Sequence, residues 1–404
     1  MKWASALCLT TQSENALAEA LADVKAQLAG ARPDVVFLFA TPHHRAHYDL
    51  IGAGVFAELN PRHALGCSGG GVIGAGREAE QVPALSVTAA VLPNVKIQPL
   101  RLEEETLPNP DAGPRAWEEA TGIKAADNPQ FIVLADPYSI HAEDMLEGLD
   151  FAYPKSVKIG GLASGGSRPA QNVLYLDNDR YRIGAVGLAL SGEIRIDTLV
   201  AQGCRPIGKP MSITKCFRNI LIELDKRRTL EVLSELYNSA SEADQQLMRT
   251  PSFLLLGLVM DPFKNGEPRT GDFLIRNIMG SDTDKGVLQI SSPLREGQTV
   301  QFHLRDAASA SEDLLEILRR YSTESLDATG GEALPPPIRG ALLFSCLGRG
   351  KHLYGRADHD TEAFRQQIGD APLAGFFCNG EIGPIAGVSH IHGFTSCFGL
   401  FRNA

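Results

Sequence analysis

An internal repeat constrains the fold of this chain more than any other feature of its sequence. Three stretches begin with a Pro or Arg, run into a strand that is nearly continuous in apolar residues, and reach a turn. They are PDVVFLFATPHH from Pro33, PQFIVLADPYSI from Pro129 and RGALLFSCLGRG from Arg339. Each is followed by a stretch with helical character, a short apolar strand ending in small residues, and another strand. A fourth, weaker copy starts at Pro251.

The repeat predicts related units of strand, helix, strand and strand, two in an N-terminal half and two in a C-terminal half. Strands that are apolar on both faces are typical of a sheet covered on both sides. Each unit would cover one sheet face with helices and pack the other on a sister sheet about 10 Å away. The predicted fold is mixed α/β, with sheets packed face to face and helices outside. The alternative is that any α/β chain resembles itself weakly, but the glycine positions agree as well as the apolar ones.

The domain boundary is predicted from an amphipathic helix between the halves. This helix is expected from about Thr229 to Asn238, and it closes an N-terminal domain of residues 1–238. Residues 239–404 form the predicted C-terminal domain. A second, Pro/Gly-rich linker is expected from Ser322.

Charge and composition exclude several classes of protein. The net charge is −10 and no basic stripe is visible, so neither nucleic acid nor anionic membrane is an expected partner. The seven cysteines are scattered, odd in number and never in CxxC spacing, unlike a disulfide framework or a zinc ribbon. No apolar run reaches the roughly 18 residues of a membrane helix. The N-terminus predicts a strand near Trp3–Leu9 and a helix over Ser13–Leu28 rather than a signal peptide, so we expect a cytoplasmic protein.

A glutamate bracketed by glycines marks the candidate ligand site. In LAGFFCNGEIGP, Glu381 follows a predicted buried strand, with Gly380 and Gly383 around it, and loops at strand ends commonly carry function. Arg349 lies between two glycines at the end of a neighbouring strand. Arginine for a carboxylate and glutamate for an ammonium group make a minimal amino-acid clamp. Alternatively, the two side chains pair with each other or have no common role. The predicted ligand-binding residues are Arg349, Gly350, Cys378, Asn379, Gly380, Glu381, His392, Cys67 and Ser68.

Two cysteines and two histidines near the same strand ends allow three interpretations. Cys346, Cys378, His390 and His392 come close together if the predicted topology holds. They could form a metal site of two thiolates and two imidazoles. Cys346 could instead be a nucleophile with His390 or His392 as its base. We favour buried apolar cysteines and hydrogen-bonded histidines, with no metal and no cofactor.

The N-terminal half offers two weaker patterns. His43 and His47 would share one face of a helix, as a metal pair does, but the glutamate of the metalloprotease pattern is missing. Three glycines within Gly69–Gly74 match dinucleotide-binding spacing, yet no sustained helix follows them. We expect the glycine-rich stretch around Cys67 either to line the ligand site with its backbone or to form a packing turn.

Several stretches, in order along the chain, resemble the FIST domain family. DVVFLFATPHH and ALGCSGGGVIG resemble its opening, GCRPIGKPMSITKCFRNILIELDKRRTLEVL resembles the close of its N-terminal region, and FSCLGRG, PLAGFFCNGEIGP and HGFTSCFGLF resemble its C-terminal region. The resemblance covers about residues 3 to 402. One departure is Lys226, Arg227 and Arg228, where the family usually has a DG-x-PA pattern.

The resemblance implies a sensory module of signal transduction that binds a small ligand, with amino acids proposed for the family, and no established enzymatic activity. Because no kinase, cyclase or F-box segment is visible, we expect a separate signalling protein as partner, with oligomers allowed. The alternatives are a cysteine-dependent hydrolase or transferase that uses Cys346, and a protein-interaction scaffold without a ligand.

Overall fold

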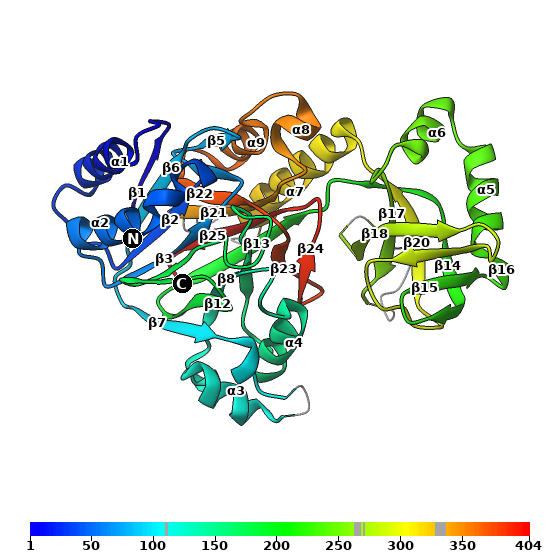
Figure 1. Ribbon diagram of the computed structural model, residues 1–404, viewed down its shortest axis with the longest axis horizontal. Coiled ribbons are helices and arrows are strands. Elements are labelled where there is room, and N and C mark those ends of the chain that lie inside the picture. The colour runs from blue at the N-terminus through cyan, green and yellow to red at the C-terminus, as the bar shows by residue number, and fades with distance from the viewer. Residues whose placement is uncertain (110–111, 262–267, 270, 328–336) are drawn as a thin grey trace. The chain divides into compact units, whose positions relative to one another are not determined.

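The computed structural model describes residues 1–109, 112–261, 268–269, 271–327 and 337–404 (Figure 1). These residues form two compact units. The larger unit contains Met1–Val200 and Leu315–Ala404, and the smaller unit contains Ala201–Leu314. The predicted boundary near Asn238 therefore falls inside the smaller unit. Across the described ranges, no helix has the length and apolar character needed to span a membrane.

Three six-stranded sheets make up the larger unit. The first contains, in order, β1 (Lys2–Cys8), β6 (Leu85–Val91), β2 (Val35–Ala40), β3 (His63–Ser68), β10 (Leu174–Leu176) and β11 (Asp179–Tyr181). The second contains β7 (Val95–Leu102), β12 (Ala185–Gly192), β8 (Gln130–Ala135), β9 (Lys158–Leu162), β23 (Glu381–Ile385) and β24 (Val388–His392). The third contains β13 (Arg195–Ala201), β25 (Ser396–Arg402), β21 (Gly340–Cys346), β22 (Leu373–Cys378), β4 (Gly71–Gly74) and β5 (Arg77–Glu80).

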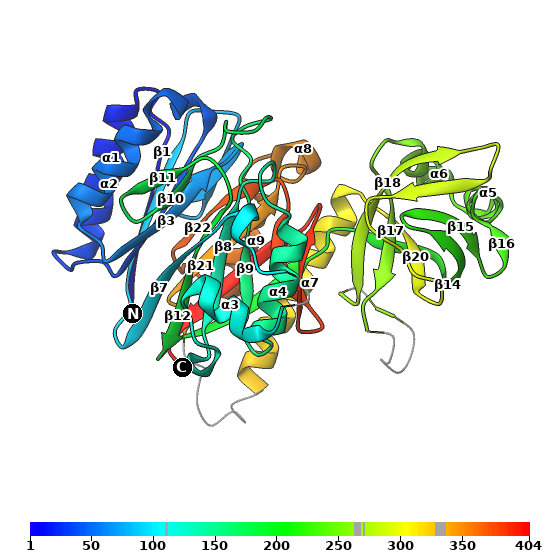
Figure 2. The ribbon, with the colours of Figure 1, turned by 60° about the horizontal axis from the view of Figure 1, so that its bottom comes forward.

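All three sheets share one plan. The strands β1–β6 belong to the first segment of the chain, β7–β12 to the second, and β13 with β21–β25 to the third, and each segment contributes a hairpin to the sheet of another segment. The parallel pairs are β2 with β3, β8 with β9 and β21 with β22. Beside each pair lies a hairpin from elsewhere: β10–β11 joins β3, β23–β24 joins β9, and β4–β5 joins β22. The first segment thus contributes to the third sheet, the second to the first, and the third to the second (Figure 1, Figure 2). This cyclic exchange ties the three segments into one unit.

Glycines at matching positions confirm the repeat. Gly66, Gly160 and Gly375 lie on the second strand of each parallel pair, opposite Leu38, Val133 and Leu343. A Cβ at any of the three would overlap the carbonyl oxygen of the residue opposite. Gly160 and Gly375 also have φ of +153° and +155°, which L residues rarely adopt. The same backbone approach therefore requires glycine three times.

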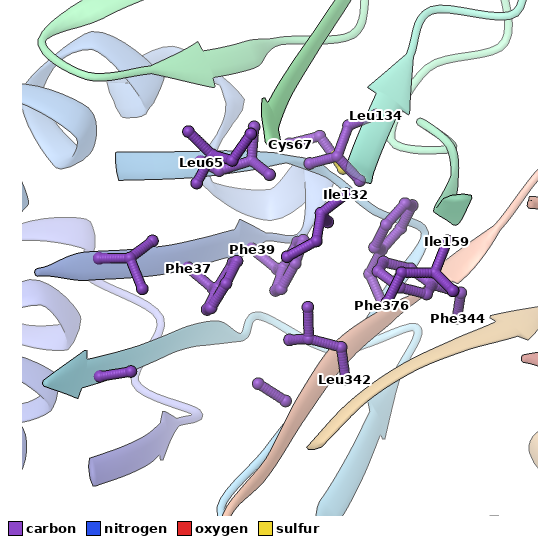
Figure 3. Packing of buried hydrophobic residues seen from close by; sticks show 14 of the residues in the cluster. Phe37, Phe39, Leu65, Cys67, Ile132, Leu134, Ile159, Leu342, Phe344 and Phe376 are labelled. Carbon is purple, nitrogen blue, oxygen red and sulfur yellow. The ribbon is translucent and has the colours of Figure 1, made fainter. Parts of the chain in front are cut away.

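The core lies between the sheets and the helices cover their outer faces, as predicted. One apolar cluster joins residues from all three sheets, including Phe39, Ile132 and Phe376, and Phe39 stacks on Phe376 at 5.1 Å between ring centroids (Figure 3). The helices are α1 (Ser13–Leu28) and α2 (Tyr48–Leu59) on the first sheet, α3 (Pro114–Thr121) and α4 (Ala142–Ala152) on the second, and α8 (Gly350–Tyr354) and α9 (His359–Ile368) by the third. The predicted first strand and first helix are confirmed within two residues.

The smaller unit has a different sheet topology from the three segments of the larger unit. Its strands are β14 (Arg205–Phe217), β20 (Thr299–Leu304), β17 (Leu254–Val259), β18 (Phe273–Asp282), β19 (Val287–Ile290), β15 (Ile220–Leu224) and β16 (Arg227–Arg228). β14 pairs with both β20 and β15, so the sheet closes on itself. Every described pairing in it is antiparallel, which requires no helical crossover. The fourth copy expected from Pro251 therefore does not repeat the parallel plan.

Three further helices lie among or after these strands in the chain: two between β16 and β17, and one after β20. The helix expected from Thr229 is confirmed as α5 (Thr229–Ser239), followed by α6 (Glu242–Arg249). The linker expected from Ser322 is helical at its start, because α7 extends over Ala307–Asp327. The rest of that predicted linker, residues 328–336, lies outside the described residues.

Candidate functional site

The carboxyl ends of the parallel strands in the larger unit meet in one place, which we call the strand-end cluster. It contains Ser68–Gly70 at the end of β3, Ser164–Gly166 after β9, Cys346–Leu347 at the end of β21, and Cys378–Glu381, which run from the end of β22 to the start of β23. Ser164 N and Gly165 N donate to the Ser68 carbonyl at 3.1 and 3.2 Å. Asn379 N donates to the Leu162 carbonyl at 3.0 Å, and Leu162 N donates to the Gly380 carbonyl at 2.8 Å. Ligands of α/β proteins commonly bind at this end of the strands.

The rim of the cluster presents polar groups to solvent from the second and third segments. The half-buried Ser164 hydroxyl accepts from Gly70 N at 2.9 Å and donates to the Phe377 carbonyl. Asn379 is exposed, and Cys346 is half-buried. Leu347 N donates to the Cys378 carbonyl at 3.0 Å, and its side chain remains 42% exposed. Serine and asparagine side chains together with backbone groups can recognise a small polar molecule.

A chain of buried polar side chains supports the rim from below. The Ser68 hydroxyl donates to Asn172 Oδ1 at 3.1 Å, Asn172 Nδ2 donates to Asp136 Oδ1 at 2.9 Å, and Ser139 Oγ donates to Asp136 Oδ2 at 2.6 Å. Ser68, Asn172 and Asp136 are fully buried. Burial of these polar side chains without hydrogen-bond partners would be unfavourable. Their hydrogen bonds therefore fix the position of the loop that follows β9. Sequence reasoning missed Asp136, Asn172 and Ser164, although Asp136 directly follows one of the three repeated strands.

Arg349 is engaged within its own segment. Its Nε and second guanidinium nitrogen donate to the two Asp360 oxygens at 2.9 and 3.2 Å, and the Tyr354 hydroxyl lies 2.6 Å away. Both members of the ion pair are buried. Burial alone would raise the pKa of Asp360, but Arg349 and hydrogen bonds from His359 and Ser396 hold that pKa well below its ordinary value. Arg349 could therefore bind a ligand carboxylate only if this ion pair opened.

Glu381 also faces the interior. It is fully buried, and its Oε2 accepts from Thr395 N at 3.2 Å. Its register partner is His392, whose Nε2 lies 3.0 Å from the Gly383 carbonyl oxygen. The structure thus places Glu381 close to the predicted residues Cys378 and His392, while Arg349 pairs with Asp360. Gly350, with φ of +58°, leaves the space that the Glu80 carboxylate fills.

The cysteines of the larger unit fall into two groups. Cys67, Cys378 and Cys397 are buried, and burial raises the pKa of each thiol well above its ordinary value. Cys346 is half-buried, and its sulfur accepts from Gly348 N at 3.5 Å. A nucleophilic role therefore remains a hypothesis for Cys346 alone. Among the described residues, no three His, Cys, Asp or Glu side chains gather as a metal site requires.

The two N-terminal patterns have structural explanations. Pro42–His47 form a 3-10 helix, so His43 and His47 do not share the α-helical face that the metal-pair hypothesis assumed. His44 Nδ1 and His47 Nδ1 lie 2.9 and 3.2 Å from the Ser13 hydroxyl. Gly71–Gly74 form strand β4 of the third sheet, which pairs with β5 in a hairpin. The glycine-rich stretch brings its backbone to the strand-end cluster at Gly70.

Comparison with known proteins establishes the family. The FIST N domain model matches residues 34–227 and the FIST C domain model matches residues 229–384, so the chain belongs to the FIST family. An uncharacterized protein of Mycobacterium tuberculosis H37Rv is 34% identical over 96% of both chains. An uncharacterized protein of Mycobacterium bovis is 32% identical over 98% of this chain and 97% of its own. FIST domains are sensory domains of signal transduction.

One solved structure, of a cyanuric acid hydrolase, is also similar over the whole of both chains. That hydrolase has been described as an evolutionary innovation by structural concatenation. The sequence identity is 11% and the TM-score is 0.32. A likeness at that level supports no conclusion about the activity of this chain.

Proposed function

We propose that this FIST protein senses a small polar metabolite, an amino acid or a related compound, which binds at the rim of the strand-end cluster. The observation that carries the proposal is the meeting of Ser164, Asn379 and Cys346. These solvent-reachable groups come from different segments, and hydrogen bonds between their loops hold them in one place. A ligand at the rim would contact two or three segments at once.

Such contacts would couple binding to the arrangement of the segments. The loop after β9 bonds to the first segment through Ser68 and to the third through Phe377 and Asn379. A ligand that binds one arrangement of these loops more tightly than another shifts the population toward it. The signal would then pass to a separate protein partner that recognises the favoured arrangement.

The proposal is tested by thermal-shift and calorimetric titration of the full chain against the common amino acids, organic acids and nucleotides. A ligand at a hundred times its dissociation constant stabilises a protein by about 2.7 kcal/mol, which shifts the melting temperature measurably. We expect one metabolite class to stabilise the protein, with binding weakened at least tenfold in Asn379→Ala and Ser164→Ala. Asn15→Ala, exposed on α1, is the matched control and should bind as the wild type does.

Two results would count against this function. A flat response over the whole panel would leave the scaffold hypothesis as the better one. A ligand that binds the Asn379→Ala and Ser164→Ala variants with unchanged affinity would place the sensing site elsewhere. Arg349→Ala is unsuitable for this test, because it leaves the buried Asp360 carboxylate without its cation.

Cys346 supports a second candidate function, a cysteine-dependent hydrolase or transferase. It is the half-buried thiol of the cluster, and the Gly348 amide donates to its sulfur. A nucleophilic cysteine has a depressed thiol pKa. Alkylation of Cys346 by iodoacetamide as a function of pH measures that pKa, with Cys346→Ser as the blank. A midpoint below about 7 would favour the enzyme, and a midpoint at or above that of a free thiol would exclude it.

A further inference from the structure

A buried tyrosine hydroxyl next to the strand-end cluster has no acceptor. Tyr48 is the first residue of α2 and is fully buried. Among the described residues, no side chain or carbonyl group accepts a hydrogen bond from its hydroxyl. Burial raises the pKa of Tyr48 to about 12, while the nearby Arg45 and Ser68 act in the opposite direction. The hydroxyl is therefore a protonated donor that lies beside a cation and a member of the cluster.

Two arginines flank this tyrosine and hold one loop. Arg45 is exposed, and a guanidinium nitrogen donates to the Gly165 carbonyl at 2.5 Å. Arg182 is half-buried, with its Cζ 5.9 Å from the centroid of the Tyr48 ring, and it donates to the Asn172 carbonyl at 3.3 Å. Within the described ranges neither arginine is paired with a carboxylate. Since a guanidinium has five donors, each arginine retains most of its capacity to bind an anion.

We propose that Arg45, Arg182 and the Tyr48 hydroxyl form a binding site for an oxyanion, the carboxylate or phosphate group of the ligand. The inference rests on the proposed function, because it assigns a charged group to the ligand of the strand-end cluster. Arginine matches the geometry of both oxyanions, and a tyrosine hydroxyl supplies a third donor. The chain as a whole carries a net charge of −10, so an anion would need such a local concentration of cationic donors.

The same contacts indicate how the anion would act on the fold. Gly165 and Asn172 lie at the two ends of the loop after β9, and each arginine holds one end through a backbone carbonyl. An oxyanion is a stronger acceptor than a neutral carbonyl and would compete for both guanidinium groups. Binding would release these two loop contacts, so amide hydrogen exchange in residues 165–172 should change when the anion binds.

The test uses the full chain and three probes at fixed ionic strength: succinate, inorganic phosphate and the neutral analogue succinamide. Calorimetry and thermal shift should detect binding of succinate or phosphate but not of succinamide. Arg45→Gln and Arg182→Gln should each weaken that binding at least tenfold, and Tyr48→Phe about threefold, as expected for loss of one hydrogen bond. Arg115→Gln, whose arginine pairs with Glu119 on the exposed face of α3, is the charge-matched control and should leave binding unchanged. Succinate binding without phosphate binding would identify a carboxylate site, and the reverse a phosphate site.

The outcomes separate this inference from the proposed function. Absence of binding by both anions, or anion binding that survives in Arg45→Gln and Arg182→Gln, overturns the oxyanion site. If a metabolite binds through Ser164 and Asn379 but is unaffected by the arginine variants, the function stands and the inference fails. If anions bind through the arginines while the metabolite panel is flat, the inference stands and the proposed function fails.

Discussion

The Arg349 guanidinium and the Asp360 carboxylate form a two-pronged ion pair inside the third segment. Their nitrogen–oxygen distances are 2.9 and 3.2 Å, and both side chains are buried. Ser345 and Ser396 donate to the same carboxylate. This network joins the ends of β21 and β25 to α9, so Arg349 is fixed by the fold of the third segment.

Loss of Arg349 should therefore destabilise the protein. Arg349→Ala leaves a buried carboxylate without its cation, which typically lowers the free energy of unfolding by about 3–5 kcal/mol. Urea unfolding monitored by circular dichroism measures the change. Arg356→Ala is the control, since Arg356 pairs with Glu362 at the surface and such pairs contribute about 0–1 kcal/mol. Equal effects of the two substitutions would contradict the structural role of Arg349.

Gly375 allows a test of the close backbone approach between β21 and β22. In Gly375→Ala the new Cβ would overlap the Leu343 carbonyl oxygen, and φ of +155° strains any L residue. We expect a loss of at least about 3 kcal/mol or no folded protein, because neither backbone strand can move away inside a sheet. In Gly393→Ala the Cβ meets nothing within 4 Å, so this control should fold normally. A stable Gly375→Ala protein would show that the two strands can separate enough to admit a methyl group.

The buried Glu78 carboxyl should make stability depend on pH. Burial, and then the negative charge of Asp360, raises the pKa of Glu78 to about 8. The folded state then holds a proton that the unfolded state releases near the ordinary pKa of 4.5. The contribution of this proton to the free energy of unfolding is therefore complete below pH 4.5 and is lost as the pH rises to 8. Glu78→Gln mimics the protonated form and should raise the free energy of unfolding by about 2 kcal/mol at pH 8.

The measurement for Glu78 is urea unfolding of wild type and Glu78→Gln at pH 5, 6, 7 and 8. The difference between the two proteins should grow with pH. Glu58→Gln serves as the control, since Glu58 is an exposed residue paired with Lys25. A Glu78→Gln protein that is less stable than the wild type at pH 8 would mean that the carboxyl is ionised in the fold and stabilised there.

Local patterns predicted the strands of the fold, while distant contacts determined its topology. The strands at Val35–Ala40, Gln130–Ala135 and Gly340–Cys346 follow from continuous apolar runs, and the shared glycines follow from one backbone approach repeated three times. The exchange of hairpins could not be predicted, because pairing such as Ile73 with Gly375 joins residues far apart in the chain. A four-residue strand carries no signal that selects among three similar sheets.

In the candidate site too, local sequence predicted the strand ends, whereas the partners of the side chains depended on contacts between distant parts of the chain. Glycines around Arg349 and Glu381 correctly indicated strand ends, and Asn379 lies at the rim. The partner of Arg349 depended on which of several nearby carboxylates the fold brings into contact with it, and it is Asp360 rather than Asp358, which is closer in the chain. Tyr48 and Arg182 carried no motif, and they come together only because a hairpin of the second segment joins the first sheet.

The smaller unit contains a buried histidine that should govern its stability in acid. His303 on β20 packs edge-on against Phe273 at 4.6 Å between ring centroids, and its Nδ1 lies 3.1 Å from the Gln301 carbonyl oxygen. Burial lowers the pKa of His303 to about 4, although the Gln301 carbonyl acts in the opposite direction. The folded state therefore keeps the imidazole neutral at a pH where the unfolded chain binds a proton.

The direction of this pH dependence follows from the number of protons that the folded and unfolded states bind. Above pH 6.5, the ordinary histidine value, neither state binds the proton and the stability of the smaller unit is complete. Between pH 6.5 and 4 the unfolded state binds more protons, so the free energy of unfolding should fall by about 3 kcal/mol. Hydrogen exchange of the β17 and β20 amides at pH 7, 5.5 and 4.5, corrected for intrinsic rates, measures this local stability. His303→Phe removes the titrating group and should flatten the pH dependence, whereas the exposed His352→Phe should retain it. If the acid sensitivity of β17 and β20 persists in His303→Phe, another group controls the stability of this unit.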